Sequence, residues 1–206
     1  MKTNVYVDGF NLYYGSVRGT PYRWLDVRAM CSGLLPRSTI NRVHYFTALV
    51  DSRPDDPDKP VRQLAYWRAL ATTGVEIHRG HFLTNPKLMR LVTPLPDGTA
   101  SLEVWKTEEK GSDVNLATRL LCDGYEGDYE AAAIISNDSD LAYPMEMVQK
   151  KFRVPMLLLH PSRHPNVKLA AQADFVKWIR GKYLRQYQLP PVLIDANGTI
   201  TKPAAW

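Results

Sequence analysis

The sequence predicts an α/β fold in which helices flank a mainly parallel sheet. Short β-prone runs alternate with stretches of helical apolar spacing over most of the 206 residues, and this alternation is typical of parallel α/β sheets. Two of the runs, VYV at 5–7 and AAAIIS at 131–136, lead directly into acidic turns. Ligands of open α/β sheets bind outside the carboxyl ends of the strands. We therefore expect the functional residues at that edge.

The first part of the chain is expected to supply three strands and two helices. Strands are predicted where β-branched and aromatic residues cluster, at residues 5–7, 40–50 and 75–83. Helices are predicted from apolar spacing at residues 24–35 and from 60 to about 73. Asp26 is a plausible cap or first-turn acid of the earlier helix. Pro60 suits the first turn of the later one, where its missing N–H has no partner to lose.

Residues 84–107 break the alternation and are predicted to form an inserted hairpin. Two β-prone runs, LMRLVTPL and TASLEVW, flank the turn pair Asp97-Gly98 within this segment. β-Prone runs joined by such a pair are the signature of a hairpin. We expect the hairpin to lie beside the main sheet.

The remaining residues return to the alternating pattern. A helix is expected at 114–122, with Ser112 or Asp113 as its cap. Strands are expected at 131–136 and 154–160. A further helix is expected at 141–151 and a helical stretch at 166–183. The pair Asn197-Gly198 predicts a small hairpin in the tail. We expect one domain over residues 1–183 and a C-terminal extension over 184–206.

Composition narrows the class of protein. Hydrophobic residues make up 45% and charged residues 23% of the chain, as in ordinary globular domains. No apolar run is long enough to cross a bilayer, and no secretory signal precedes the first strand. The two cysteines are far apart in sequence, which favours a reducing, cytoplasmic setting. The net charge of +5 is compatible with a polyanionic partner without requiring one.

Acidic side chains follow the strands in a way that predicts a metal site. Asp8 and Asp138 come at strand ends, Asp140 lies two residues further on, and Asp113 opens the intervening helix. Four carboxylates brought together would repel one another, and a hard dication such as Mg²⁺ or Mn²⁺ would relieve that repulsion. Structural roles are the alternative: Asp8-Gly9 is also a turn pair, and Asp113 and Asp140 are good helix caps.

Three segments resemble a known family. The motifs are VDGFN at 7–11, EKGSDVNLA at 109–117 and SNDSDL at 136–141, and they look like the three motifs of the NYN domain, the LabA-like branch of the PIN-like nuclease superfamily. The resemblance implies a Rossmann-like, PIN-like fold and cleavage of RNA at an acidic Mg²⁺ or Mn²⁺ site. Asn137 stands where a glycine is frequent in the third motif, which affects the turn but removes no acid.

The motif positions assign roles to individual residues. The resemblance makes Asp8, Asp113, Asp138 and Asp140 the acidic set. Asp8 and Asp138 follow strands directly and are the best direct metal ligands, whereas Asp113 and Asp140 would bind the metal through water or orient an attacking water. Asn11 matches the polar residue after the first acid and would hydrogen-bond a metal-bound water or a phosphate oxygen. Further residues are expected to contact substrate or to shape the acidic loop: Lys110, Ser136, Ser139, Arg18 and Tyr14.

Other reactive side chains are given structural interpretations. His78 and His81 are three residues apart on an expected strand, so they face opposite sides and cannot readily share a metal. We expect His160 and His164 in a solvated loop, with contact to substrate as the alternative. Cys31 and Cys122 are expected to be buried. A solvated loop that caps the next helix is expected at Asp55, Asp56 and Asp58. Aromatic rings that either pack in the core or stack on bases lie beside Arg18 and Arg23, at Tyr13, Tyr14 and Trp24.

The leading functional hypothesis is a metal-dependent ribonuclease that acts on single-stranded or structured RNA. One alternative is a regulatory module that binds metal or RNA without cleaving it. Another is an enzyme for a small molecule, with residues 84–107 as a lid, because fold alone does not fix function. We expect no membrane partner, and a homodimer is compatible with the sequence.

Overall fold

The computed structural model describes all 206 residues and confirms the predicted α/β class. A six-stranded parallel sheet has the order β3-β2-β1-β6-β7-β8. Its strands are β1 (Lys2–Asp8), β2 (Thr39–Thr47), β3 (Val75–Arg79), β6 (Ala131–Ile135), β7 (Met156–His160) and β8 (Phe175–Trp178). The strand order reverses between β1 and β6, the place where open α/β sheets bind ligands.

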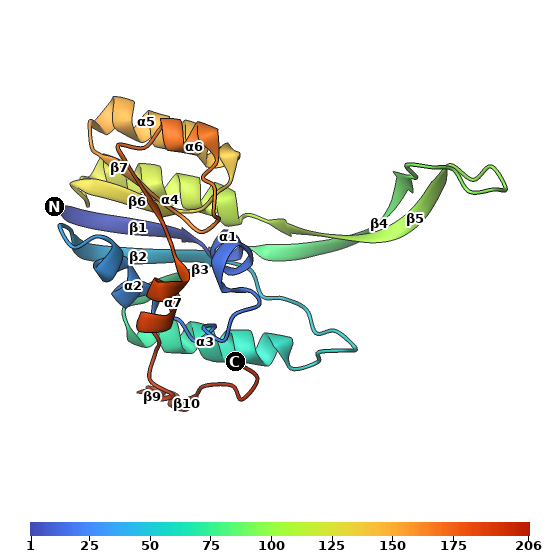
Figure 1. Cartoon of the computed structure of the whole chain (residues 1–206), viewed down its shortest axis with the longest axis horizontal. Helices are drawn as coiled ribbons and strands as arrows, with labels where there is room; N and C mark the ends of the chain where they lie inside the picture. Colours follow the sequence, from blue (N-terminus) through green and yellow to red (C-terminus); the bar gives the residue numbers. More distant parts are fainter.

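Helices cover both faces of the sheet (Figure 1). On one face lie α4 (Ser112–Glu126), α5 (Ala142–Phe152) and α6 (Val167–Ala171); on the other lie α2 (Val27–Leu34), α3 (Lys59–Thr72) and α7 (Gly181–Gln186). Alternate residues of β1 supply the two cores, because strand side chains alternate between faces. Val5 and Val7 join the cluster with α2 and α3, whereas Tyr6 joins the cluster with α4 and α5. All three residues are fully buried.

The chain turns sharply at the end of β1. Asp8 caps the short helix α1 (Gly9–Leu12), and a π-helical turn, η1 (Tyr13–Val17), follows directly. The cap prediction for Asp26 is confirmed, since its Oδ1 accepts a hydrogen bond of 2.9 Å from the Ala29 amide at the start of α2. The motif residues after β1 are therefore held within a compact, hydrogen-bonded segment.

The strand expected at 75–83 is two strands. β3 ends at Arg79, and β4 (His81–Arg90) pairs with β5 (Ser101–Lys110) in a separate antiparallel arm that extends away from the body (Figure 1). The break falls at Gly80, where a Cβ atom would lie 2.5 Å from the Lys110 carbonyl oxygen. The arm begins before residue 84 and ends after residue 107, so it is longer than the predicted insertion.

The helical stretch predicted at 166–183 is wrong in its middle. β8 separates α6 from α7 and forms the edge of the sheet beside β7. Its sequence, Phe-Val-Lys-Trp, is rich in β-prone residues. β8 is only four residues long, so the helical spacing around it conceals it in the sequence. It forms a strand because it pairs with β7.

The tail folds back onto α3. β9 (Val192–Asp195) and β10 (Gly198–Thr201) form the hairpin predicted at Asn197-Gly198. Arg68 of α3 donates to both carboxylate oxygens of Asp195, at 2.7 and 2.9 Å. The division at residue 183 stays a prediction. None of the helices combines the length and apolar character needed to span a bilayer.

Candidate acidic metal centre

Asp8 is the most enclosed of the predicted acids. It is 3% exposed at the carboxyl end of β1, and its Oδ1 accepts a hydrogen bond of 2.9 Å from the Asn11 amide. Its Oδ2 accepts from Asn11 Nδ2 at 2.6 Å and from Ser136 Oγ at 3.0 Å. Burial raises the pKa of Asp8 even though these hydrogen bonds oppose the rise, and the charge of Asp138 adds to it. The carboxylate is thus fixed in place and costly to ionise alone.

Asp138 is tied to Asp8 through one hydroxyl group. Ser136 Oγ, which donates to Asp8, accepts a hydrogen bond of 3.1 Å from the Asp138 amide. Asp138 Oδ1 in turn accepts from the Asp140 amide at 2.9 Å and caps the 3-10 turn η2 (Ser139–Leu141). The capping side chain of this loop is therefore Asp138, and the carboxylate of Asp140 makes no capping bond.

Asp113 faces the same cluster from α4. The expected cap at Ser112 or Asp113 is wrong, because the N-cap is Gly111, which has a φ of 99° and no side chain. Asp113 lies in the first turn with a carboxylate that capping does not use. Its pKa is raised to about 6, first by burial and then by the negative charges of Asp8, Asp138, Glu109 and Asp140. The structure therefore brings the four predicted acids into one electrostatic cluster.

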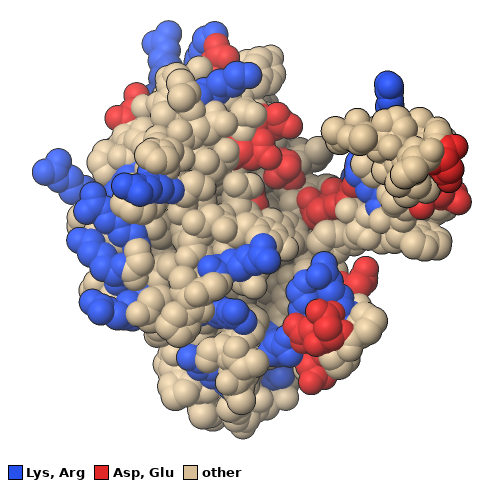
Figure 2. Space-filling view, turned by 45° about the vertical axis from the view of Figure 1, so that its right-hand side comes forward, with Lys and Arg blue, Asp and Glu red and all other residues tan.

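No positive side chain neutralises this cluster. The ion pairs of the chain include none to Asp8, Asp113, Asp138 or Asp140. Acidic side chains gather where the body faces the base of the arm (Figure 2). Carboxylate oxygens without a cationic partner are the donors that Mg²⁺ and Mn²⁺ prefer. The donor chemistry of these residues therefore suits the hard dication that the sequence motifs imply, although no three of the four carboxylates bring their oxygens within 4.8 Å of one another.

Two asparagines connect the acidic loops. Asn11 Oδ1 accepts a hydrogen bond of 3.2 Å from the Asn137 amide, which links α1 to the loop after β6. Asn137 Oδ1 accepts from the Asn166 amide at 2.7 Å, and its Nδ2 donates to the His164 carbonyl at 3.3 Å. The Asn137 side chain thus holds the loop at His164 and Asn166. A glycine, which is frequent at this position of the third motif, could not make these hydrogen bonds.

Of the residues expected to contact substrate, Ser136 is buried and the others lie at the surface or at the base of the arm. Ser136 is fully buried, and its hydroxyl bonds to the Asp8 carboxylate and to the Asp138 amide. It therefore shapes the acidic loop, which is one of the two roles predicted for it. Tyr14 is 58% exposed, and the Arg18 guanidinium lies over its ring at 5.4 Å. Ser139 lines a surface hollow with Asp140. Lys110 ends β5 and pairs with Glu108 at 3.0 Å, at the base of the arm.

Several structural interpretations are corrected. His160 is buried and its Nδ1 lies 2.7 Å from the Ser162 carbonyl oxygen, so a solvated position is wrong for it. Cys31 is buried as expected, but Cys122 is exposed.

Trp24 belongs to the core, whereas His81 sits on the arm opposite Lys110. Asp58 precedes α3 without a side-chain capping bond, and Asp56 instead pairs with Arg62.

Sequence reasoning missed part of the site. Glu109 lines the acidic hollow together with Asp8, Asp113 and Phe82, and its Oε1 accepts hydrogen bonds from the Ser112 amide and hydroxyl at 3.1 and 2.7 Å. Its position within EKGSD, three residues before Ser112, is a signal that could have revealed it, because it satisfies the amide of the first residue of α4.

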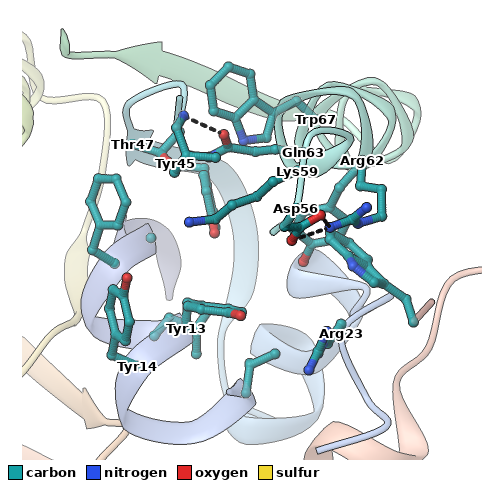
Figure 3. A pocket seen from close by; sticks show the side chains of 17 residues that line it. Tyr13, Tyr14, Arg23, Tyr45, Thr47, Asp56, Lys59, Arg62, Gln63 and Trp67 are labelled. Atoms are coloured by element: carbon teal, nitrogen blue, oxygen red, sulfur yellow. Dashed lines mark hydrogen bonds and ion pairs between the residues drawn. The ribbon is translucent and has the colours of Figure 1, made fainter. Parts of the chain in front are cut away.

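A second, more apolar cavity adjoins the acidic hollow. It has a volume of about 140 Å³ and shares Phe10 and Tyr14 with that hollow. Aromatic side chains from η1, β2 and α3 form much of its wall, and the Lys59 side chain extends into it (Figure 3). Lys59 is absent from the ion pairs of the chain. The cavity was not predicted because its lining comes from segments as distant in sequence as Gly9 and Trp206.

Comparison with known proteins identifies the family. The chain is 30% identical to the 6-hydroxy-3-succinoylpyridine 3-monooxygenase HspA of Pseudomonas putida (strain DSM 28022 / S16), over all of this chain and 75% of that protein. Its fold is similar to the crystal structure of a protein of unknown function from Vibrio parahaemolyticus RIMD 2210633, with a TM-score of 0.57 and 17% identity over 91% of this chain and 96% of that one. The NYN domain matches residues 2–179. The chain therefore belongs to the NYN domain family.

Proposed function

We propose that the chain is a metal-dependent ribonuclease. The observation that carries the proposal is the uncompensated cluster of Asp8, Asp113, Asp138 and Asp140 at the point where the strand order reverses. Membership of a nuclease-like family supports it. A net charge of +5 leaves basic side chains elsewhere that suit a polyanionic partner.

In the proposed mechanism Asp8 and Asp138 would hold Mg²⁺ or Mn²⁺. The bound ion would polarise a phosphoryl oxygen and lower the pKa of a water molecule. Asp113 and Asp140 would be available to orient that water, because neither carboxylate is used in a cap or an ion pair. Asn11 fixes Asp8 from both sides of its carboxylate.

The exposed aromatic and basic residues near α1 supply the proposed RNA contacts. The Tyr14 ring, with Arg18 over it, offers a surface for stacking a base and a guanidinium for a phosphate. Lys110 stands at the base of the arm, beside Glu109 of the acidic hollow. We infer that a single-stranded segment passes between α1 and the arm toward the acids.

The test is cleavage of a labelled single-stranded RNA and a labelled RNA hairpin by purified protein, with Mn²⁺, with Mg²⁺ and with EDTA. Asp8→Asn and Asp138→Asn should each lower the cleavage rate by about 10²–10³-fold while the circular dichroism spectrum is kept. Asp55→Asn is the matched control, because Asp55 lies in an exposed loop. Equal cleavage by the parent and both site variants contradicts the proposal. Metal binding without cleavage of any RNA supports the regulatory module instead.

The aromatic cavity favours a second candidate, an enzyme that acts on a small aromatic anion. The cavity places Lys59 and Arg23 among tyrosine and tryptophan rings, and the relative HspA is named for a reaction on a substituted pyridine. In this case the rings would pack on the substrate and Lys59 would hold an acidic group.

This second candidate is tested by thermal unfolding with a panel of aromatic carboxylates, because a ligand of the native state raises the unfolding temperature. Lys59→Met should abolish the stabilisation by acids, whereas Lys87→Met, on the exposed arm, should not. Stabilisation by no member of the panel contradicts this candidate and leaves the ribonuclease proposal unaffected.

A further inference from the structure

A second group of potential metal ligands lies away from the acidic centre, on the face of the sheet covered by α4. His44 of β2 is paired in register with Glu76 of β3, and His78 follows two residues after Glu76. Side chains two residues apart on a strand share a face, so all three point the same way. Their candidate ligand atoms all lie within 4.8 Å of one another.

The spacing of these atoms matches a metal coordination shell. His44 Nδ1 lies 3.0 Å from His78 Nε2 and 3.5 Å from Glu76 Oε2. Zinc bonds to histidine nitrogen and carboxylate oxygen are about 2.0–2.2 Å long, so neighbouring ligand atoms of a tetrahedral site are about 3.3–3.5 Å apart. Both distances from His44 Nδ1 are therefore within a few tenths of an ångström of this spacing.

Asp123 lies beside His44 at ion-pair distance, without a hydrogen bond between the two side chains. Its Oδ2 lies 3.2 Å from His44 Nε2, on the ring edge opposite the cluster. A carboxylate this close to Nε2 favours the proton there, so that Nδ1 accepts the hydrogen bond that joins the rings of His44 and His78, and a bound ion would take the place of this hydrogen bond. Asp123 is itself fully buried and held by the Tyr6 hydroxyl at 2.7 Å and by Arg119 at 2.7 Å. Carboxylate–histidine–metal arrangements are the usual outer support of histidine ligands.

The imidazole rings are also fixed by stacking. Tyr6 stacks on His44 with a centroid distance of 5.3 Å, and Phe46 stacks on His78 at 4.7 Å. Glu76 is anchored through its other oxygen, which accepts a hydrogen bond of 2.9 Å from Arg42. The Glu76 side chain is 43% exposed, so an ion has a route from solvent and water has room to complete its shell.

We propose that His44, Glu76 and His78 bind a divalent transition-metal ion of the class that prefers imidazole ligands, with Zn²⁺ as the reference ion. Two histidines and one glutamate are a known donor set for zinc with an open position. The donor chemistry differs from that of the all-oxygen acidic centre, which suits Mg²⁺ or Mn²⁺. Helix α4 spans both sites, since Asp113 lies in its first turn and Asp123 in its last part.

The proposal is tested by calorimetric titration of Zn²⁺ into full-length protein that lacks a histidine tag and has been treated with a chelator. Asp8→Asn/Asp138→Asn serves as the background, so that the acidic centre does not compete for the ion. One Zn²⁺ should bind per chain in this background. Added His78→Asn or Glu76→Gln should weaken binding at least about tenfold. His81→Asn is the matched control, because His81 lies on the arm outside the cluster.

Titration of Co²⁺ gives a second readout that buried packing alone would not produce. The visible absorption of bound Co²⁺ should appear in the background protein and disappear on addition of one equivalent of Zn²⁺. It should be absent from the His78→Asn variant, whose fold is verified by circular dichroism. Unchanged Zn²⁺ affinity in both ligand variants overturns the proposal, as does the lack of stoichiometric binding by the folded background protein.

Discussion

Ser136 donates a hydrogen bond of 3.0 Å to the Asp8 carboxylate and thereby joins the carboxyl ends of β1 and β6. The same hydroxyl accepts a bond from the Asp138 amide at 3.1 Å. One buried oxygen therefore sets the positions of the two acids that we propose as metal ligands. This relationship explains why a fully buried serine occurs at the end of β6.

Ser136→Ala should damage the acidic centre without removing an acid. The loss of the hydroxyl frees Asp8 Oδ2 from one of its two donors and leaves the Asp138 amide without its acceptor. We expect kcat for RNA cleavage to fall about 10–100-fold with little change in KM, as for residues that orient metal ligands. Stability should fall by about 1–3 kcal/mol, because buried polar groups lose a partner.

Steady-state cleavage assays and urea denaturation measure these two effects. Ser52→Ala, in the exposed loop before α3, is the matched control and should change neither quantity. An unchanged kcat in a folded Ser136→Ala protein would show that the Asp8–Asp138 spacing is not important for cleavage.

Asp113→Asn should stabilise the metal-free protein and weaken its response to metal. Asp113 is half-buried among other negative charges, and the substitution removes one of them. We expect the free energy of unfolding in EDTA to rise by about 1 kcal/mol. Added Mn²⁺ should stabilise the parent through binding to the native state, and it should stabilise the variant less. Urea denaturation with EDTA and with Mn²⁺ measures both, and an equal gain in the two proteins would exclude Asp113 from the metal centre.

The acidic centre could be predicted because its signals are local. Asp8, Asp113 and Asp138 each stand within a short motif next to a strand or a helix start, and parallel strands bring such positions to one edge. The caps were harder to assign. Gly111, with a φ of 99°, begins α4 without a side chain, and nothing in the run Gly-Ser-Asp distinguishes this from capping by Ser112.

The remaining features depend on contacts between distant segments. β8 is a strand because it pairs with β7, and four residues of β-prone sequence are too few to show that alone. The His44–His78 contact depends on the register between β2 and β3. Its members are 34 residues apart, and no spacing rule links them.

Gly80→Ala should strain the base of the arm. A Cβ atom there would lie 2.5 Å from both the Glu109 carboxylate and the Lys110 carbonyl oxygen, and the backbone atom cannot move aside as a side chain can. We expect a loss of about 1–3 kcal/mol in stability, as for other overpacked positions. Cleavage should also fall, because Glu109 supports the start of α4 where Asp113 lies.

Gly181→Ala is the control for this change. An added Cβ meets no atom within 4 Å there, so stability should stay within about 0.5 kcal/mol of the parent. Thermal unfolding of the two variants gives the comparison. Equal stability of both would mean that the arm can shift at its base without cost.

Asp128→Asn should destabilise the protein at neutral pH and lose that effect in acid. Burial raises the pKa of Asp128, but hydrogen bonds from Asn4 and Lys2 and the charges of Arg42 and Lys2 outweigh it and lower the pKa to about 2. A carboxylate whose pKa is lower in the folded chain stabilises that state above its ordinary pKa of 3.8. This stabilisation is lost as the pH falls from about 4 toward about 2.

We expect Asp128→Asn to cost about 1–2 kcal/mol at neutral pH, since part of the attraction comes from exposed cations. Urea denaturation of the parent, Asp128→Asn and the exposed-loop control Asp55→Asn, repeated at falling pH, should show the first difference shrinking below about pH 4. A difference that stays constant with pH would assign the effect of Asp128 to packing instead of charge.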